Sequence, residues 1–293
     1  MALYWPAFEF TYTLDIAQLL PYIAAIEGNK AASSSYVLPP PWRERICSGE
    51  SEVPLCDVSA QAARNRQINL RKLELLNNNA SRAHAWVRQR FIPGSAPMSL
   101  DDILAMHRTV AEEAGIRYDN VGVLRKDGQK VVVGDAEIGY HVGAPAATLP
   151  RLMDDYLQFI SSASLTSMPA PIHALVAHFF LATIHPFEDG SGRVSRLVAA
   201  GILFQRGYRG HGLYALSGHF YENQGQYYRI VFKQQQEPCP DLTEFIAFGL
   251  EGLALELRGI SSFIKVKLNR FVDREALAAS RKQRRSRNRQ APL

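Results

Sequence analysis

Cysteine is scarce in this sequence, which has three in 293 residues: Cys47, Cys56 and Cys239. The number is odd, and no two of them stand in the C-x-x-C spacing that thiolate metal sites and redox motifs use. The count and the spacing argue against both a disulfide framework and a zinc site, and the composition fits a reducing compartment.

Long hydrophobic runs are also absent. The longest apolar segment, ALVAHFFLATI, contains a histidine and falls well short of the ~18 residues that a membrane span needs. The opening residues, MALYWPAFEF, lack the basic start and the apolar stretch of a secretory signal. We therefore expect a soluble, cytoplasmic protein with no membrane partner.

Acidic residues are fewer than basic ones, and the imbalance has a single source. The net charge is +5, but the segment RKQRRSRNRQ near the end holds six basic residues and no acid. The rest of the chain is close to neutral. We expect a solvated tail and no nucleic-acid partner, although contact of this tail with nucleic acid or an acidic surface stays open.

The chain divides into three parts. The segment AASSSYVLPPPW, residues 31–42, predicts a linker, because its serines and three prolines disfavour both helix and sheet. This linker falls within a helical N-terminal extension, residues 1–98. Residues 99–257 form the predicted core domain, and residues 258–293 are expected to hold a C-terminal helix and the basic tail.

Helix signals dominate the core domain. Apolar residues recur there at helical spacing, behind residues that favour the first turn of a helix. These first-turn residues are Ser99 with Asp102, Thr148 with Pro150, and Asp241 with Glu244. The sequence therefore predicts a mostly α-helical fold.

One region departs from the helical pattern. In NVGVLRKDGQKVVVGDAEIGYHV, residues 120–142, Asp127 and Gly128 stand between arms rich in valine, a pairing typical of a type I′ turn. We predict a β-hairpin that turns at these two residues. Because a lone hairpin is marginally stable in water, it must pack on the helical body.

The most informative stretch is IHPFEDGSGRVSRL, which begins at Ile184. The apolar helix before it should end at His185, because Pro186 disfavours helical geometry in the residue that precedes it. A glycine-rich turn follows. A second helix is then expected from Arg193 to a glycine C-cap at Gly207.

This stretch suits chemistry on a phosphate-linked group. The opening amides of the second helix lack internal acceptors, and the glycines let an anion approach them. Arg193 and Arg196 can hold phosphate oxygens with their guanidinium forks. Asp189 is a suitable Mg²⁺ ligand beside phosphates, and His185 can accept a proton at neutral pH. We predict transfer of a phosphate-linked group to a hydroxyl.

The same residues resemble the signature of Fic domains (filamentation induced by cAMP), H-x-F-x-[DE]-G-N-[GK]-R-x-x-R. The stretch HPFEDGSGRVSR agrees at every defined position except Ser191, where the family has asparagine. Weaker similarity extends over residues 99–257. The resemblance implies a Fic-type helical bundle with a β-hairpin flap. It also implies transfer of AMP from ATP to a Ser, Thr or Tyr hydroxyl of a target protein, or of the enzyme itself.

Carried over by position, the resemblance assigns a role to each motif residue. His185 is expected to be the catalytic base, Phe187 to anchor the loop in the core, and Asp189 to hold Mg²⁺. The expected nucleotide- and phosphate-binding residues are Gly190, Ser191, Gly192, Arg193 and Arg196.

In Fic proteins the hairpin acts as a flap that aligns an extended segment of the target by strand addition. Such docking uses backbone hydrogen bonds and leaves the target unidentified, and the oligomeric state, including a homo-oligomer, stays open as well. The resemblance implies docking along seven residues: Gly134, Asp135, Ala136, Glu137, Ile138, Gly139 and Tyr140.

Ser191 keeps two alternatives open. Its hydroxyl is shorter than the carboxamide that would help to orient phosphate, so we expect a slower reaction more than lost binding. One alternative is a catalytically weak nucleotide-binding scaffold that interacts with a partner. The other is transfer of a different phosphate-linked group, since some relatives transfer UMP, a phosphate or phosphocholine.

Many Fic proteins carry an inhibitory helix with the pattern [ST]-x-x-x-E-[GN]. One candidate, IAAIEGNK, supplies Glu27 but has Ile23 where the hydroxyl residue belongs. The other candidate has Ser59 in register but Ala63 in place of the glutamate. We favour the second alignment, which leaves the chain without an inhibitory carboxylate, and keep Glu27 as the alternative.

Other polar and aromatic residues near the motif have competing interpretations. His178, two turns before the motif histidine, is expected to be a hydrogen-bonded core residue more than a second catalytic histidine. Glu188 is expected to diverge from the metal, because adjacent residues in a tight turn point apart. Tyr221, Tyr227 and Tyr228 either line the site of the nucleotide base or pack in the core.

Overall fold

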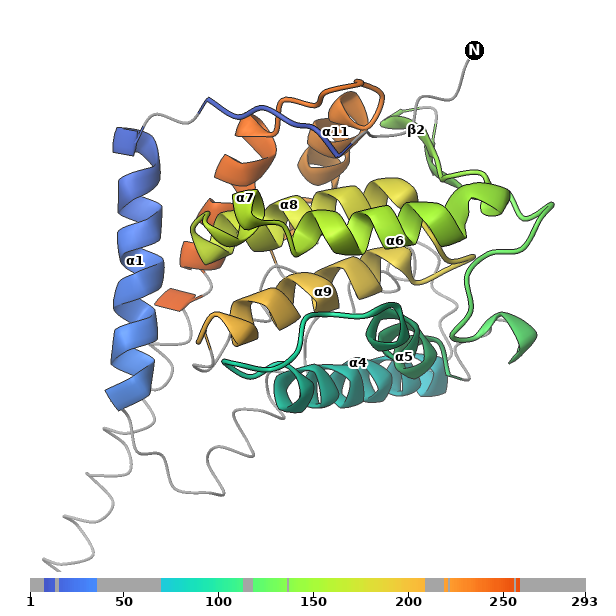
Figure 1. Cartoon of the computed structure of the whole chain (residues 1–293), viewed down its shortest axis with the longest axis horizontal. Helices are drawn as coiled ribbons and strands as arrows, with labels where there is room; N and C mark the ends of the chain where they lie inside the picture. Colours follow the sequence, from blue (N-terminus) through green and yellow to red (C-terminus); the bar gives the residue numbers. More distant parts are fainter. Residues whose placement is uncertain are drawn as a thin grey trace, which may run out of the picture.

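The computed structural model describes residues 8–13, 16–35, 70–112, 118–135, 137–208, 219–220, 222–255 and 257–258. Within these residues the fold is a bundle of α-helices with one two-stranded antiparallel sheet (Figure 1). The predicted mostly α-helical class is confirmed. The named helices are α1 (Ile16–Ser35), α4 (Leu70–Arg90), α5 (Leu100–Ala111), α6 (Leu149–Ile160), α7 (Ala163–Thr166), α8 (Ala170–Ile184), α9 (Ser191–Gln205) and α11 (Gln224–Gln234). Residues 243–255 are also helical.

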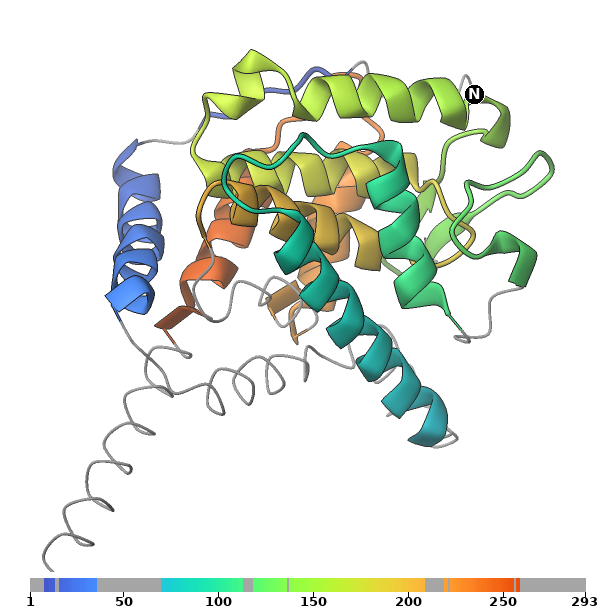
Figure 2. The same cartoon turned by 60° about the horizontal axis from the view of Figure 1, so that its bottom comes forward.

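Helices α8 and α9 form the centre of the bundle and pack along each other. Every residue of α8 is buried, which explains why its sequence is apolar on all sides. Helix α6 packs against α8, while α4 and α5 pack against α9 (Figures 1 and 2). The motif loop, residues 185–190, joins the end of α8 to the start of α9 and so leaves directly from this buried centre.

A short N-terminal segment, residues 8–13, runs across the bundle. The amide of Leu242 donates to the carbonyl of Thr11 at 2.9 Å, which ties this segment to the backbone before residues 243–255. Phe8 packs against Phe180 of α8 with 5.5 Å between ring centroids. The first described residues and the last helical segment are therefore held together on one side of the core.

The capping signals are confirmed at one helix and differ at another. The Ser99 hydroxyl accepts from the Asp102 amide at 3.2 Å, and the Asp102 carboxylate accepts from the Ser99 amide at 2.9 Å, which completes a capping box for α5. Thr148 does not cap α6 with its side chain. Its hydroxyl donates to the carbonyl of Pro145 at 2.8 Å, because the 3₁₀ turn η2 (Ala146–Thr148) precedes the helix.

The predicted linker begins later than expected. Helix α1 continues to Ser35, so residues 31–35 are helical, and residues 36–42 lie outside the described part of the chain. Alanine and serine can extend a helix that is already formed, and the first proline of the linker comes only at Pro39. Among the described residues, no helix has both the length and the apolar character that a bilayer span requires.

The β-hairpin is present, but the position predicted for its turn is wrong. Strand β1 (Val132–Asp135) pairs with β2 (Gly139–Val142) in the register Val132 to Val142, so the chain reverses between these strands. Asp127 and Gly128 form a separate turn before β1, with Gly128 at φ 84°. The valines that were assigned to the second arm of a hairpin are in fact its first arm. We call β1, β2 and their connection the flap.

Candidate active site

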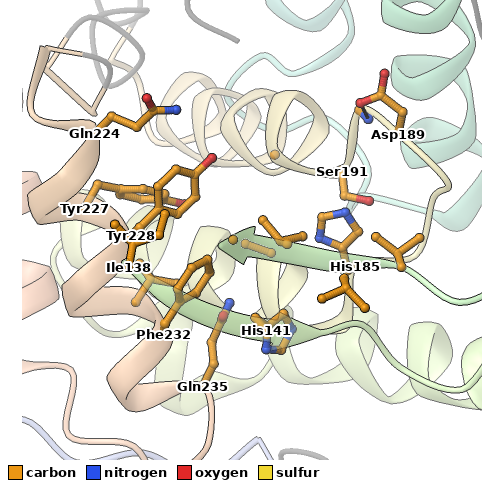
Figure 3. A pocket seen from close by; sticks show the side chains of 18 of the residues that line it. Ile138, His141, His185, Asp189, Ser191, Gln224, Tyr227, Tyr228, Phe232 and Gln235 are labelled. Carbon is orange, nitrogen blue, oxygen red and sulfur yellow. Dashed lines mark hydrogen bonds between the residues drawn. The ribbon is translucent and has the colours of Figure 1, made fainter. Parts of the chain in front are cut away.

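The motif loop begins where α8 is forced to end. His185 adopts a left-handed backbone conformation, φ 51° and ψ 62°, and its amide still donates to the carbonyl of Leu181 at 3.0 Å. This conformation is uncommon for a residue with a side chain, and the Pro186 that follows disfavours a continued helix. The predicted end of the helix is confirmed. The change of direction brings the imidazole to the wall of a pocket (Figure 3).

The pocket has a volume of about 710 Å³ and lies between the flap, the motif loop with the start of α9, and α11. Its two ends differ in character (Figure 3). The polar end is lined by His185, Glu188, Asp189, Gly190, Ser191, Gly192 and Arg196. The other end is lined mainly by apolar and aromatic residues, Ile138, Tyr227, Tyr228, Val231 and Phe232, together with Gln224 and Gln235. The structure thus brings the predicted base and most of the predicted phosphate-binding residues to one cavity.

The imidazole of His185 is uncharged at neutral pH. Burial, and then the neighbouring His141 and Arg125 side chains, lower its pKa from 6.5 to about 4. A neutral imidazole has an unprotonated ring nitrogen and can take a proton from a hydroxyl. The environment therefore supplies the protonation state that the predicted base requires.

The start of α9 forms the anion-binding side of the pocket. Gly190 is the N-cap and has φ 86°, a left-handed conformation that glycine adopts without strain. Its amide is already used, since it donates to Oδ1 of Asp189 at 2.6 Å. The amides of the first helical turn have no acceptor within the helix, and Ser191 and Gly192 of this turn line the pocket.

The Ser191 side chain closes the motif loop. Its hydroxyl oxygen accepts from the amide of Phe187 at 3.1 Å and lies 3.3 Å from the carbonyl of the same residue, to which the hydroxyl donates. Ser191 is 1% exposed. The hydroxyl at this position is thus directed at the loop backbone and joins the start of α9 to Phe187.

The two motif arginines lie in different places. Arg196 lines the pocket, as the prediction required. Arg193 lies beside the loop and is not among the residues that line the cavity. Its Nη1 donates to the carbonyl of Val110 at 2.9 Å, and its Nη2 pairs with Oδ2 of Asp189 at 3.1 Å. In this structure Arg193 links α5 to the loop.

Asp189 is suited to bind a hard cation such as Mg²⁺ that is also coordinated by the phosphates of a bound substrate. Its side chain is 63% exposed at the polar end of the pocket. Mg²⁺ commonly binds through one or two carboxylates together with substrate phosphates and water. Within the described residues no cluster of three or more His, Cys, Asp or Glu side chains could hold a metal by itself. A single exposed carboxylate beside the start of α9 fits Mg²⁺ that is carried in with a polyphosphate.

His107 of α5 supports the loop from behind, and the sequence analysis did not identify it. Its ring stacks on Phe187 with 3.9 Å between centroids and 4° between planes. Nδ1 accepts from the amide of Gly122 at 2.9 Å, so Nε2 carries the proton and donates to the carbonyl of Asp189 at 3.0 Å. Burial lowers the pKa of His107 to about 4. No local signal could have revealed this residue, because its partners are distant in sequence.

Glu188 and Asp189 diverge, in agreement with the expectation for adjacent residues in a tight turn. The side-chain amide of Asn120 donates to a carboxylate oxygen of Glu188. Asp189 instead interacts with the amide of Gly190 and with Arg193. The segment between α5 and the flap thus fixes the outer side of the loop through Asn120.

The flap forms one side of the pocket. Gly134 has φ 106°, and a β-carbon there would lie 2.0 Å from the carbonyl oxygen of Gly139, so this position requires glycine. Gly134, Glu137 and Ile138 line the pocket, while Tyr140 is 52% exposed. The predicted docking residues therefore lie at the tip of the hairpin. Ala136 and the side chain of Asp135 lie outside the described structure.

Tyr227 and Tyr228 both line the pocket, while Tyr221 lies outside the described residues. The hydroxyl of Tyr227 lies 3.0 Å from Nε2 of His178, which is fully buried. Burial lowers the pKa of His178 to about 3. His178 is therefore the hydrogen-bonded core histidine that the sequence indicated.

Glu27, the alternative inhibitory residue, lies away from the pocket. It is exposed on α1, and the hydroxyl of Tyr208 donates to its carboxylate. Tyr208 follows the C-terminal end of α9, whereas the pocket is lined by Ser191, Gly192 and Arg196 near its N-terminal end. Ser59 and Ala63, the residues of the favoured alignment, lie outside the described residues.

Part of this chain is similar in sequence to a known protein family and to curated relatives. Residues 97–203 match the model of the Fic/DOC family. The protein adenylyltransferase Fic of Drosophila ananassae is 32% identical over 111 residues, which are 38% of this chain and 20% of that protein. The protein adenylyltransferase fic-1 of Caenorhabditis briggsae is 33% identical over 111 residues, again 38% and 20% of the two chains. The match thus spans about a fifth of the length of these curated relatives.

Solved structures of Fic proteins share the fold. A Fic family protein from Desulfovibrio desulfuricans G20 superposes with a TM-score of 0.66 at 22% identity, covering 89% of this chain and 77% of that one. Fic-1 from C. elegans superposes with a TM-score of 0.63 at 16% identity, covering 86% and 74%. Together with the loop, the flap and the pocket, these matches confirm the resemblance seen in the sequence. The matched part of the chain, residues 97–203, is therefore similar to the Fic/DOC family in sequence and in fold.

Proposed function

We propose that this protein is an adenylyltransferase that transfers AMP from Mg-ATP to a Ser, Thr or Tyr hydroxyl of a protein. One observation carries the proposal. The neutral imidazole of His185 lies in the same pocket as the N-terminus of α9 and Arg196. A base and an anion-binding site that share one cavity suit the attack of a hydroxyl on a phosphate. Relatives named protein adenylyltransferase support the choice of AMP as the group transferred.

The triphosphate would bind at the polar end of the pocket. The first-turn amides at Ser191 and Gly192 have no acceptor within the helix and can donate to an anion, and the guanidinium of Arg196 can hold phosphate oxygens. Asp189 would hold Mg²⁺, which when bound neutralises phosphate charge and helps to orient the phosphates. The base of the nucleotide would lie toward Tyr228 and Ile138 at the other end.

The transfer step would use His185 as the base. Its unprotonated ring nitrogen takes the proton of the target hydroxyl while the hydroxyl oxygen attacks the α-phosphorus of ATP. The bond between the α-phosphorus and the bridging oxygen breaks, and pyrophosphate leaves. The products are a phosphodiester between AMP and the target side chain, pyrophosphate, and the proton left on the imidazole.

The flap would align the target. An extended segment can add to the exposed strand edge by backbone hydrogen bonds, and the tip of the flap borders the same pocket as His185. A hydroxyl residue in that segment would then face the base. Selection by backbone contacts is tolerant of sequence, so neither the target nor its modified residue follows from the flap.

The test is incubation with labelled ATP and Mg²⁺, with intact-mass analysis of the protein and of added substrates. We expect an adenylyl mass on the protein or on a target, which disappears in His185→Ala. The matched control is His178→Gln, which changes a buried histidine of the same helix outside the loop. Absence of transfer by the wild-type protein to itself and to lysate proteins would contradict the proposal.

A second candidate is a nucleotide-binding module with weak or no transfer. It is favoured by Ser191, whose hydroxyl is bonded to Phe187. Calorimetry with Mg-ATP separates the two candidates. The module predicts binding that Arg196→Ala abolishes, together with no adenylyl mass in the wild-type protein.

A further inference from the structure

Four consecutive carbonyls, of residues 183–186 at the end of α8 and just after it, accept hydrogen bonds from the flap, from the backbone beside it and from Arg125. We call residues 129–131 and 143–144, on either side of the flap, its two roots. The carbonyl of Thr183 lies 2.7 Å from Nε2 of His141 in β2, and the carbonyl of Ile184 accepts from the amide of Ala144 at 2.9 Å. The next two carbonyls, of His185 and Pro186, both accept from Arg125. The last carbonyls of a helix normally have no hydrogen-bond donor within the helix. Here His141, Ala144 and Arg125 provide the donors.

Arg125 makes more of these contacts than any other residue of the group. Its Nε donates to the carbonyl of His185 at 2.9 Å, and its amide donates to the carbonyl of Pro186 at 2.9 Å. Its Nη2 donates to the carbonyl of Ala144 at 2.7 Å, and its Nη1 to the carbonyl of Gln129 at 2.9 Å. One side chain therefore reaches Gln129, three residues before β1, Ala144, two residues after β2, and the backbone of His185.

Arg125 is buried, so its guanidinium needs hydrogen-bond acceptors within the protein. The residue is 5% exposed, and within the described part of the chain its guanidinium partners are backbone carbonyls, with no carboxylate paired to it. A buried cation is costly unless its donors are satisfied. Its planar fork can serve three acceptors at once, which an ammonium group cannot do with the same geometry.

Gly143 shows how closely the flap approaches His185. A β-carbon at this position would lie 2.9 Å from Cβ of His185 and 3.0 Å from Nη2 of Arg125. The amide of Gly143 also extends the flap ladder by donating to the carbonyl of Val131 at 3.0 Å. The root of the flap, the guanidinium and the His185 backbone are thus in contact without intervening side chains.

We propose that Arg125 is a positioning residue that fixes both roots of the flap to the backbone of His185, so that a strand docked on the flap is set at a fixed place relative to the imidazole. The proposal deepens the proposed transferase activity and rests on it for its kinetic test. It adds that flap and base move as one unit, while the phosphate-binding start of α9 is held separately.

The first test does not depend on activity. Arg125→Met removes the fork and keeps much of the aliphatic volume, and Arg125→Lys keeps the charge. Arg206→Met is the matched control, because Arg206 also donates to two backbone carbonyls but lies after the far end of α9. Hydrogen–deuterium exchange should become at least about 10-fold faster at the amides of Gly143, Ala144 and His185 in Arg125→Met, and should not change in Arg206→Met. Unchanged exchange at these amides in Arg125→Met would overturn the proposal.

The second test measures the rate of transfer and the affinity for Mg-ATP separately. Arg125→Met should lower kcat for transfer to a protein by about 100-fold, since small displacements of a base cost this much. The affinity for Mg-ATP, measured by calorimetry, should stay within about threefold of the wild type, and Arg125→Lys should fall between the two. A parallel loss of ATP affinity and rate would show a general structural defect and would overturn the assignment.

Gly143→Ala approaches the same contact from the opposite side and keeps the charge of Arg125. It should reproduce the loss of rate with retained ATP binding, and a wild-type rate would contradict the proposal even if Arg125→Met does not fold. Absence of transfer in the wild-type protein would instead contradict the proposed function. The exchange comparison would then still decide the role of Arg125.

Discussion

Two histidines, one inside α8 and one directly after its end, are both uncharged but have different roles. Burial is the largest cause that lowers the pKa of each, to about 3 for His178 and about 4 for His185, so both are neutral at pH 7. His178 is sealed in the core against Tyr227. His185 lies where the helix has ended and lines the pocket. A lowered pKa alone therefore does not identify the base, whereas the break in the helix at Pro186 does.

Replacing each of the two histidines with glutamine should give the largest difference in transfer rate. His185→Gln should slow transfer by about 10³-fold while ATP still binds, because the base is lost and the phosphate site is kept. His178→Gln should lower the melting temperature and leave transfer within a few-fold of the wild type. Transfer assays and thermal unfolding of both variants measure this, and a loss of transfer in His178→Gln equal to that in His185→Gln would remove the distinction.

His107 should have a smaller effect than His185, because it acts only through the loop that carries His185. His107→Phe keeps a ring against Phe187 but loses the hydrogen bonds to Gly122 and to Asp189. We expect transfer to fall by about 10-fold with a modest loss of stability. Initial rates at saturating ATP provide the measurement. A variant as active as the wild type would show that stacking alone holds the loop.

Acidification should separate stability from transfer chemistry. The pKa of His173 is lowered to about 4 and that of His178 to about 3, both mainly by burial. The unfolded state therefore takes up protons below pH 6.5 that the folded state does not, and stability falls as the pH is lowered from 6.5 toward 4. Each of these two histidines should lower the free energy of unfolding by about 2 kcal/mol at pH 5.

Over the same range the base at His185 keeps its neutral form down to about pH 4, where its own pKa lies. Transfer by the folded protein should therefore change little between pH 8 and pH 6. Unfolding curves and initial rates across this range test both statements. A melting temperature that rises on acidification from pH 7 to pH 5 would contradict the first, and a rate that falls tenfold between pH 8 and pH 6 would contradict the second.

Ser191→Ala should have a smaller effect. The hydroxyl serves the loop backbone at Phe187, so its loss should slow transfer by about two- to fivefold and leave the ATP affinity nearly unchanged. Gly128→Ala is a poor control because its φ is positive, and Ser164→Ala, at an exposed position on α7, is a suitable one. A loss of ATP binding in Ser191→Ala would show that the hydroxyl reaches phosphate after all.

Glu27→Gln should have the smallest effect on transfer. The carboxylate interacts with Tyr208 at the C-terminal side of α9, away from the pocket. We expect the rate of self-adenylylation to stay within about twofold of the wild type, with a small loss of stability. A large increase in rate, measured by intact mass over time, would identify Glu27 as an inhibitory residue in spite of its position.

Local signals predicted those parts of the fold that depend on neighbouring residues. The Ser99 capping box and the end of α8 at His185 follow from short-range sterics and capping, as does the glycine at Gly207 after α9, with φ 84°. The turn of the flap was misplaced because Asp127–Gly128 and the later glycines carry the same turn signal. Only the pairing of valines with β2 decides between them.

The candidate site was predictable as far as the motif extends. The motif identified His185, Asp189 and Arg196, all of which line the pocket. It did not show that Arg193 pairs with Asp189 and Val110 instead of lining the cavity. His107 and Arg125 were not identified, because both act through backbone groups of residues distant in sequence, and such contacts leave no pattern in a single chain.

The N-terminal segment that crosses the bundle has a practical consequence. Phe8 and Phe10 cover aromatic rings of α6 and α8, and Thr11 is joined to Leu242 by a backbone hydrogen bond. A shortened protein that starts after Thr13 would leave these rings facing water and would free the backbone that leads into residues 243–255. Such a version should aggregate during purification, although every residue of the motif would still be present.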